Sequence, residues 1–135
     1  MISSYNVTTQ PVLSNGIVNF TTDRILTGCT ATRNGATFQL SKPGYYYVTF
    51  NAIAAATDTV GLLTMELQRN GVAVPGAEAS VTTTVAGNVS SFAFSTIIHV
   101  PPSCCAVDNT AKLTVVNTGV DATYSNVNIN ITKLC

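Results

Sequence analysis

Residues 35–56 read GATFQLSKPGYYYVTFNAIAAA and place three tyrosines in a row at the start of an apolar run. Successive side chains of a β-strand point to opposite faces, so a strand with one face in water alternates apolar and polar residues. Here both faces carry aromatic or aliphatic groups. Tyr46 and Val48 are expected in a core, which leaves Tyr45 and Tyr47 on a second face whose exposure to water is unfavourable. The stretch therefore predicts a strand whose outer face is covered by a partner chain.

Short β-like segments, each ended by turn residues, fill the chain, and no window of a dozen residues shows helical periodicity. Asn70-Gly71 is the strongest hairpin signal, because both residues tolerate positive φ. Ten strands are expected, at residues 11–20, 24–31, 36–40, 45–56, 61–69, 72–74, 79–85, 89–100, 111–117 and 124–134. Many short strands with regularly spaced turns predict an all-β sandwich or jelly roll.

Alternation assigns the side chains of these strands to two faces. The residues expected to point inward and fill the core are Leu63, Met65, Leu67, Val81, Val85, Phe92, Phe94, Ile98, Val100, Leu113, Val115, Val127, Ile129 and Ile131. The residues of the last two long strands expected to point outward are Ala93, Ser95, Ile97, His99, Tyr124, Asn126, Asn128, Asn130 and Thr132. Two packed antiparallel sheets are the arrangement that buries the first set.

Length and composition limit the function classes. The 135 residues are expected to form a single domain, with residues 1–14 as an extended N-terminal arm. Charged residues make up 9% of the chain and its net charge is zero, so binding to nucleic acid or to an anionic membrane lacks its electrostatic term. No signal peptide is visible, and no apolar run approaches the roughly 20 residues of a membrane helix. These features favour an outward-displayed, rigid β protein.

Few residues have the chemistry of a catalytic or metal site, so no cofactor, no metal site and no enzymatic activity are expected. The cysteines are Cys29, Cys104, Cys105 and Cys135, and they lack the paired spacing of a structural zinc site. They are either disulfide partners or buried, inert thiols. His99, the only histidine, is interpreted as a hydrogen-bonded or interfacial residue, with a pH-sensitive contact as the alternative.

At residues 35–50 the sequence resembles the jelly-roll superfamily of the complement q-subcomponent and tumour necrosis factor. The residues that match its pattern, in order, are Phe20, Arg24, Gly35, Phe38, Pro43, Gly44, Tyr46 and Val48. The stretch LQRNGVAVPG at 67–76 matches the family's Asn-Gly hairpin. The close of the chain, 113–134, is most similar to the bacterial and phage branch that includes the BclA-type C-terminal tip domains. The late Gly-Asp and closing Gly-Phe-x-Gly signatures of the animal members are absent, so their ligand and calcium residues are not carried over.

This resemblance implies a ten-stranded jelly roll that assembles as a threefold trimer, with the 45–56 strand flanked by the 89–100 and 124–134 strands. The residues that it places at the trimer interface are Tyr45, Tyr47, Ile53, Ala93, Ser95, Ile97, His99 and Tyr124. The same topology brings Cys135 close to Cys104 and Cys105, which makes a disulfide with one of them the leading pairing. Cys29 is expected to stay a buried thiol.

Four hypotheses for function follow. The first is a trimeric structural protein on the surface of a bacteriophage virion, as a capsid decoration, head fibre or fibre tip, whose partners are its own copies and a capsid, tail or fibre protein. The second is a BclA-like module of a spore surface or cell surface. The third is a carbohydrate-binding or receptor-binding domain that uses loops at Thr57, Asp58, Asn88 and Asp121. The fourth, a thiol hydrolase, is disfavoured because no base lies near Cys104 or Cys105 in sequence except His99, beyond a Pro-Pro break.

Overall fold

The chain folds into two antiparallel β-sheets that pack face to face. A computed structural model describes residues 1–28, 31–102 and 111–134. The strands within these residues, in chain order, are β1 (Ile2–Asn6), β2 (Gln10–Val12), β3 (Thr22–Leu26), β4 (Ala31–Asn34), β5 (Thr37–Leu40), β6 (Gly44–Ala56), β7 (Gly61–Arg69), β8 (Val72–Thr83), β9 (Ser90–Val100), β10 (Ala111–Asn117) and β11 (Ala122–Lys133). In this described part, no helix has the length and apolar character needed to cross a bilayer.

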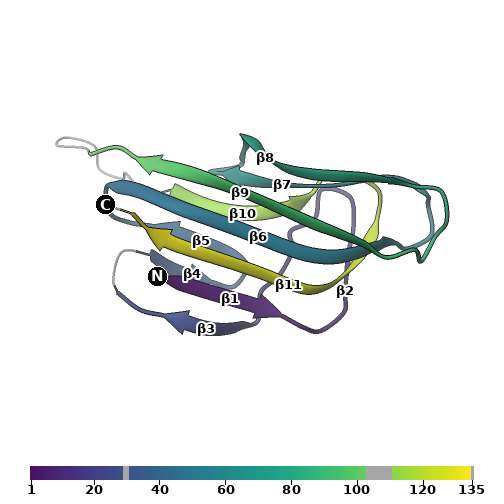
Figure 1. The fold of residues 1–135 in the computed structure, drawn as a ribbon, viewed down its shortest axis with the longest axis horizontal. Helices are drawn as coiled ribbons and strands as arrows, with labels where there is room; N and C mark the ends of the chain where they lie inside the picture. The colour runs from purple at the N-terminus through teal and green to yellow at the C-terminus, as the bar shows by residue number, and fades with distance from the viewer. Residues whose placement is uncertain (29–30, 103–110, 135) are drawn as a thin grey trace.

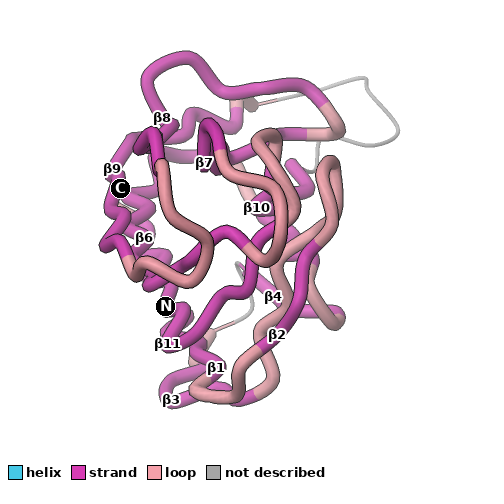
Figure 2. The backbone as a smooth tube through the Cα atoms, turned by 90° about the vertical axis from the view of Figure 1, so that its right-hand side faces the viewer, coloured by secondary structure: helices cyan, strands magenta, loops and turns pink. Residues whose placement is uncertain are grey.

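The first sheet, called the β6 sheet, has the strand order β3-β1-β11-β6-β9, with β2 paired to β11. The second, called the β7 sheet, has the order β4-β5-β10-β7-β8. Figure 2 looks along the strands and shows the two sheets as adjacent layers. In Figure 1 both chain ends lie at one end of the sandwich. The prediction that β6 is flanked by the 89–100 and 124–134 strands, both antiparallel to it, is confirmed.

The expected all-β sandwich is confirmed, but the expected count of ten strands is wrong, since eleven form within the described residues. The missed strands are β1 and β4. Residues 1–14, expected as an arm, instead supply β1 between β3 and β11, with Ile2 opposite Ile131 and fully buried. The sequence ISSYN has only one aliphatic residue, and it forms a strand because sheet neighbours on both sides satisfy its backbone.

Two other strand boundaries differ from the expectation. The segments 72–74 and 79–85 are one strand, β8, which bulges at residues 74–77 opposite Leu67, with Gly76 at φ 83°. The segment 11–20 contains only the short β2, followed by a single bridge from Ile17 to Val116. Pro75 lies inside β8 and, read from the sequence alone, suggests that one strand ends there and another begins. β8 is an edge strand, however, and an edge strand tolerates the missing N–H of a proline.

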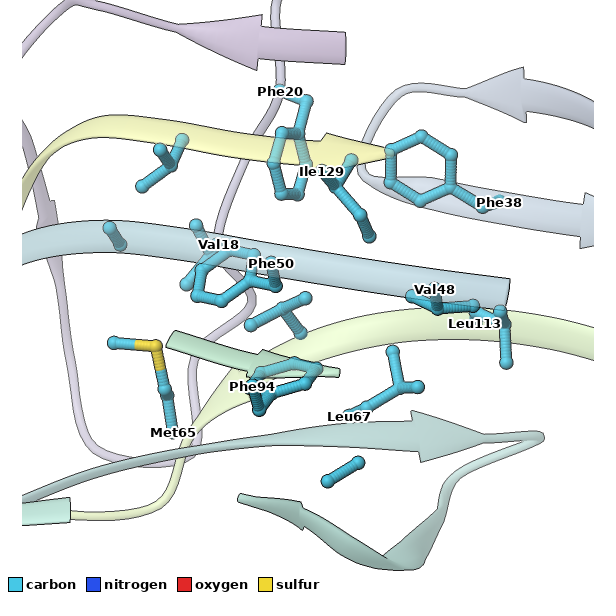
Figure 3. Packing of buried hydrophobic residues seen from close by; sticks show 14 of the residues in the cluster. Val18, Phe20, Phe38, Val48, Phe50, Met65, Leu67, Phe94, Leu113 and Ile129 are labelled. Atoms are coloured by element: carbon cyan, nitrogen blue, oxygen red, sulfur yellow. The ribbon is translucent and has the colours of Figure 1, made fainter. Parts of the chain in front are cut away.

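The core lies between the sheets and is rich in aromatic rings (Figure 3). Phe20 packs edge-on against Phe38 with ring centroids 5.2 Å apart, and Phe50 stacks on Phe94 at 5.0 Å. Almost all residues expected to point inward are buried. Val81 is only partly buried, and Val85 is exposed because β8 ends at Thr83 and the chain turns away from the sheet.

Two polar contacts hold distant segments together. Asn117 is fully buried, and its Nδ2 donates to the carbonyls of Val12 (3.1 Å) and Val120 (2.9 Å), while its Oδ1 accepts from the N–H of Gly119 (3.1 Å). Asp23 of β3 forms a two-point ion pair with Arg33 of β4, at 2.6 and 3.0 Å, and so ties the edges of the two sheets. The guanidinium lowers the pKa of the Asp23 carboxyl, and a hydrogen bond from Ser4 acts in the same direction.

Candidate assembly interface

The outer face of the β6 sheet, which points away from the core, is the surface on which most of the expected interface residues lie. Along β6 the side chains alternate, with Tyr46 and Val48 buried and Tyr45 and Tyr47 exposed, as the sequence predicts. Tyr46 donates its hydroxyl to the carbonyl of Lys42 at 2.6 Å, and burial raises its pKa. The alternation therefore fixes which tyrosines belong to the core and which to the surface.

One end of this face carries large, exposed side chains. The ring of Tyr45 stacks on the imidazole of His99 across the strands, and Tyr47 lies opposite Ile97 in the next row. Tyr45, Tyr47 and Ile97 are 45%, 42% and 56% exposed. These four residues are called the aromatic end. Apolar surface concentrated in this way is typical of a contact surface.

The middle of the same face is polar and hollowed. Its residues, called the amide rows, form two cross-strand rows, one of Thr49, Ser95 and Asn130 and one of Asn51, Ala93 and Asn128. A shallow hollow of about 430 Å³ opens between them. Asn130 Nδ2 donates to Thr49 Oγ1 at 3.2 Å. The amide rows thus present small hydrogen-bonding side chains beside the aromatic end.

The remaining expected interface residues divide between surface and core. Ala93 and Ser95 are exposed on the outer face, and Ile53 is half-buried there opposite Ser125. Tyr124 is only 1% exposed and belongs to the core, so its assignment to the outer face is wrong. The cause is a bulge between Ser125 and Asn128, in which Asn126 adopts φ 50° and one added residue reverses the alternation of β11. Burial raises the pKa of Tyr124.

The outward positions of β6, β9 and β11 carry no Asp, Glu, Lys or Arg within the described residues. Cations lie at the margins of the face: the Arg24 guanidinium sits 5.0 Å from the ring centroid of Tyr5, and Arg69 Nη1 donates to the backbone carbonyl of His99 at 2.7 Å. Burial of an unpaired charge is expensive, and a charge-free face avoids this cost when another surface covers it.

The loops proposed to bind a ligand gather at the end of the sandwich opposite the chain termini. The N–H of Thr57 donates to the carbonyl of Asp121 at 3.1 Å, and the N–H of Gly87 donates to the carbonyl of Ala56, which brings the loop of Asn88 beside them. The carboxylate of Asp121 accepts the N–H of Ser14 at 2.8 Å and therefore has a structural partner. Asp58 and Asn88 are exposed.

The cysteine predictions concern Cys29, Cys104, Cys105 and Cys135, all of which lie outside the described residues. Among the residues that are described, no group of three His, Cys, Asp or Glu side chains is placed to hold a metal ion.

A larger hollow of about 800 Å³ lies on the outward side of the β7 sheet, and none of the expected site residues lines it. Its polar groups are partly occupied within the chain, since Asn70 Oδ1 accepts the N–H of Lys112 and Gln68 Nε2 donates to Glu66.

Asn51, Asn128 and Asn130 are the residues of this face that sequence reasoning did not select as site residues. The spacing of the asparagines at 126, 128 and 130 placed them on the outward face, but nothing in that spacing distinguishes a contact residue from a solvated one. Only the hollow between the strands identifies them.

No protein-family model and no curated protein sequence matches this chain. Solved structures with a similar fold include the globular domain of the zebrafish complement 1qA protein, at TM-score 0.69 and 12% identity over 99% of this chain and 96% of that one. The Eiger TNF of S. frugiperda is similar at TM-score 0.71 and 12% identity, over 99% and 92%. Vertex protein P5 of phage PRD1 is similar at TM-score 0.61 and 18% identity, over 99% and 96%. The expected likeness to this jelly-roll superfamily is therefore confirmed for the fold, and the BclA-type branch stays a prediction.

Proposed function

We propose that this chain is a non-catalytic structural protein that assembles with copies of itself into a trimer displayed on the surface of a particle. The observation that supports self-association is the outer face of the β6 sheet. It combines the exposed aromatic end with amide rows that carry no charge. A copy that covers this face removes the rings of Tyr45 and Tyr47 from water and buries no Asp, Glu, Lys or Arg of the outward positions.

The threefold order rests on the resemblance to the complement q and tumour necrosis factor superfamily. A cyclic trimer uses a heterologous contact, in which the face of one copy meets a different surface of the next. The chain supplies such a second surface beside the aromatic end. There the bulge of β8 and the edge of β9 enclose a groove of about 290 Å³ lined by Arg69, Val72, Val74 and Pro75, and bordered by Ile97 and His99 of the aromatic end.

The particle that we favour is a bacteriophage virion, in which the chain serves as a capsid decoration, head fibre or fibre tip. The similar fold of a phage vertex protein supports this choice over a spore or cell surface. A threefold module suits positions of threefold symmetry on a capsid, and an adhesive role is compatible with the exposed loops opposite the chain ends.

Light scattering coupled to gel filtration tests self-association. At micromolar concentration we expect a single species with three times the 14.1 kDa mass of one chain, and a monomer would overturn the proposal. Virion display is tested separately, by mass spectrometry of purified particles from the source phage and by immunogold labelling of their surface. Recovery of the chain only in spore-coat or cell-wall fractions would contradict the virion assignment.

A further inference from the structure

Asn128 lies in the middle of the outer face with an unpaired hydrogen-bond acceptor. Its Oδ1 is buried and has no partner among the described residues, where the only other such side-chain atom is Thr64 Oγ1, on the other sheet. A buried acceptor without a hydrogen bond destabilises the state in which it is found. The isolated chain therefore leaves this amide incomplete, and a donor from outside the chain would stabilise it.

The surface around Asn128 has room for such a donor. Three shallow hollows surround the bulge of β11, with volumes of about 430, 460 and 330 Å³. Asn128 lines two of these hollows, and Asn51 also lines two. Because the Asn128 oxygen is itself buried, a donor from outside the chain reaches it only when the amide turns toward one of these hollows.

The amide rows also have unused hydrogen-bonding capacity. Each asparagine side chain offers two donors and an oxygen with two lone pairs. Among the described contacts, Asn130 spends one donor on Thr49, and no side-chain hydrogen bond of Asn51 is formed. This face therefore presents donors and acceptors in a fixed pattern, at positions set by the strand register of β6 and β11.

We propose that Asn51, Asn128 and Asn130 form a hydrogen-bonding layer that a second copy of the chain completes, and that this layer fixes the register of the assembly. The inference rests on the proposed self-association. Apolar contact at the aromatic end is non-directional and tolerates sliding of one copy against the other. Amide pairs stabilise only the arrangement in which donors meet acceptors, as a buried asparagine does in a coiled coil.

A second copy is the occupant that the geometry favours over a small ligand. The amide row of Thr49 is two residues from Tyr47 along β6, or about 7 Å. A partner that covers the aromatic end therefore extends over the amide rows as well. The amide rows carry no charged side chain, so a partner can cover them, as it can cover Tyr47 and Ile97, without burying a charge of these rows.

The test compares amide-to-leucine substitutions on the two outer faces. Asn128→Leu removes the unpaired acceptor, and Gln39→Leu is the matched control on the outward side of the β7 sheet. By native mass spectrometry we expect a single trimer for the wild type and for Gln39→Leu. For Asn128→Leu we expect association to persist but to spread over several masses. A single trimer of unchanged thermal midpoint for Asn128→Leu would overturn the inference.

A second variant keeps the test decisive if Asn128→Leu does not fold, which circular dichroism would reveal. Asn128→Asp keeps the shape and the acceptor but places three carboxylates in the interface at neutral pH. We expect its trimer to dissociate at least tenfold more readily at pH 7 than at pH 4, with no such change for Gln39→Glu. A mass distribution independent of pH would contradict the inference.

The outcomes separate this inference from the proposed function. A monomeric wild type would overturn both. A wild-type trimer that both Asn128 variants also form, unchanged, would overturn only the role of the layer. A monomer whose Asn128 side-chain resonances shift on addition of N-acetylglucosamine would show a sugar site in place of a contact between copies, and would also overturn it.

Discussion

The ring of Tyr45 lies on the imidazole of His99, with centroids 4.5 Å apart and planes inclined by 14°. Each ring restricts the rotamers of the other before any partner arrives. An interface built from side chains that are already ordered loses less conformational entropy on association. In the proposed assembly, the stack would therefore order part of the aromatic end before contact, with Tyr47 and Ile97 in the adjoining row.

A charge placed at the aromatic end should separate the copies without unfolding them. Ile97→Asp is expected to weaken association about 30-fold or more, equivalent to about 2 kcal/mol, because the carboxylate would be buried without a partner. Sedimentation equilibrium measures the change. Leu62→Asp, at an exposed apolar residue of the β7 sheet, is the control and should leave the mass unchanged. Equal effects of the two substitutions would argue against this interface.

Truncation of two tyrosines of the β6 sheet should affect different properties, the stability of the fold for Tyr124 and association for Tyr45. Tyr124→Ala is expected to lower the free energy of unfolding by about 3–5 kcal/mol, because it opens a cavity in the core. Tyr45→Ala should change folding of the single chain little and act on association. Urea unfolding of dilute, monomeric samples makes the comparison. A similar loss for both variants would mean that Tyr45 is also a core residue.

Asn117 should be intolerant of substitution by an apolar residue of similar size. Asn117→Leu leaves the carbonyls of Val12 and Val120 without their donor, and each buried unpaired group costs about 1–3 kcal/mol. Thermal unfolding should show a lower midpoint. Asn19→Leu, at an exposed asparagine, serves as the control and should have a much smaller effect. An unchanged midpoint for Asn117→Leu would show that the hydrogen bonds of the Asn117 side chain do not stabilise the fold.

Position 119 requires a glycine because another backbone segment passes too close to leave room for a side chain. A Cβ atom at this position would lie 2.2 Å from the carbonyl oxygen of Leu62, so the loop must shift in Gly119→Ala. We expect a loss of about 1–3 kcal/mol. Gly35→Ala is an instructive comparison, since its Cβ meets nothing within 4 Å and only the left-handed φ of 64° opposes it, at about 1 kcal/mol. A smaller loss at 119 than at 35 would contradict the steric explanation.

The Asp23–Arg33 pair should make stability fall at acid pH. Because the folded-state pKa of Asp23 lies below the unfolded value of about 3.9, its contribution is complete above that pH and is lost as pH falls through the folded pKa. For a partly exposed pair we expect about 1 kcal/mol. Urea unfolding of Asp23→Asn should therefore differ from wild type at pH 7, and the difference should shrink as the pH falls below about 4. A difference that does not change with pH would contradict the ion-pair origin, and Asp58→Asn provides the exposed control.

Alternation along uninterrupted strands could be predicted from the sequence, and it placed Tyr46 inward and Tyr47 outward correctly. Alternation failed at Tyr124 because the bulge depends on Asn126 adopting a left-handed conformation, which an asparagine permits but does not require. The strand β1 was missed because Ser3 and Ser4 are buried by neighbours remote in sequence. The local sequence pattern does not reveal pairing with strands that are remote in sequence.

The candidate site, like the fold, was predictable from the sequence only in part. The exposed ring of Tyr45 and its neighbours could be inferred from the excess of apolar residues in one strand. The hollow between Asn51 and Asn128 could not, because it depends on the register between β6 and β11 and on the bulge that shifts this register. Pairing register is a property of the folded sheet and is only weakly encoded in either strand alone.

Both chain ends leave the sandwich at one pole. The amino group of Met1 donates to the carbonyl of Thr27 at 2.9 Å, and the N–H of Leu134 donates to the carbonyl of Tyr45 at 2.7 Å, at the start of β6 (Figure 1). The loops at 57–60 and 84–89 occupy the opposite pole. A tether joined to either terminus would hold the molecule in the same orientation. An engineered display platform could therefore be anchored through its ends and carry its cargo in the distal loops.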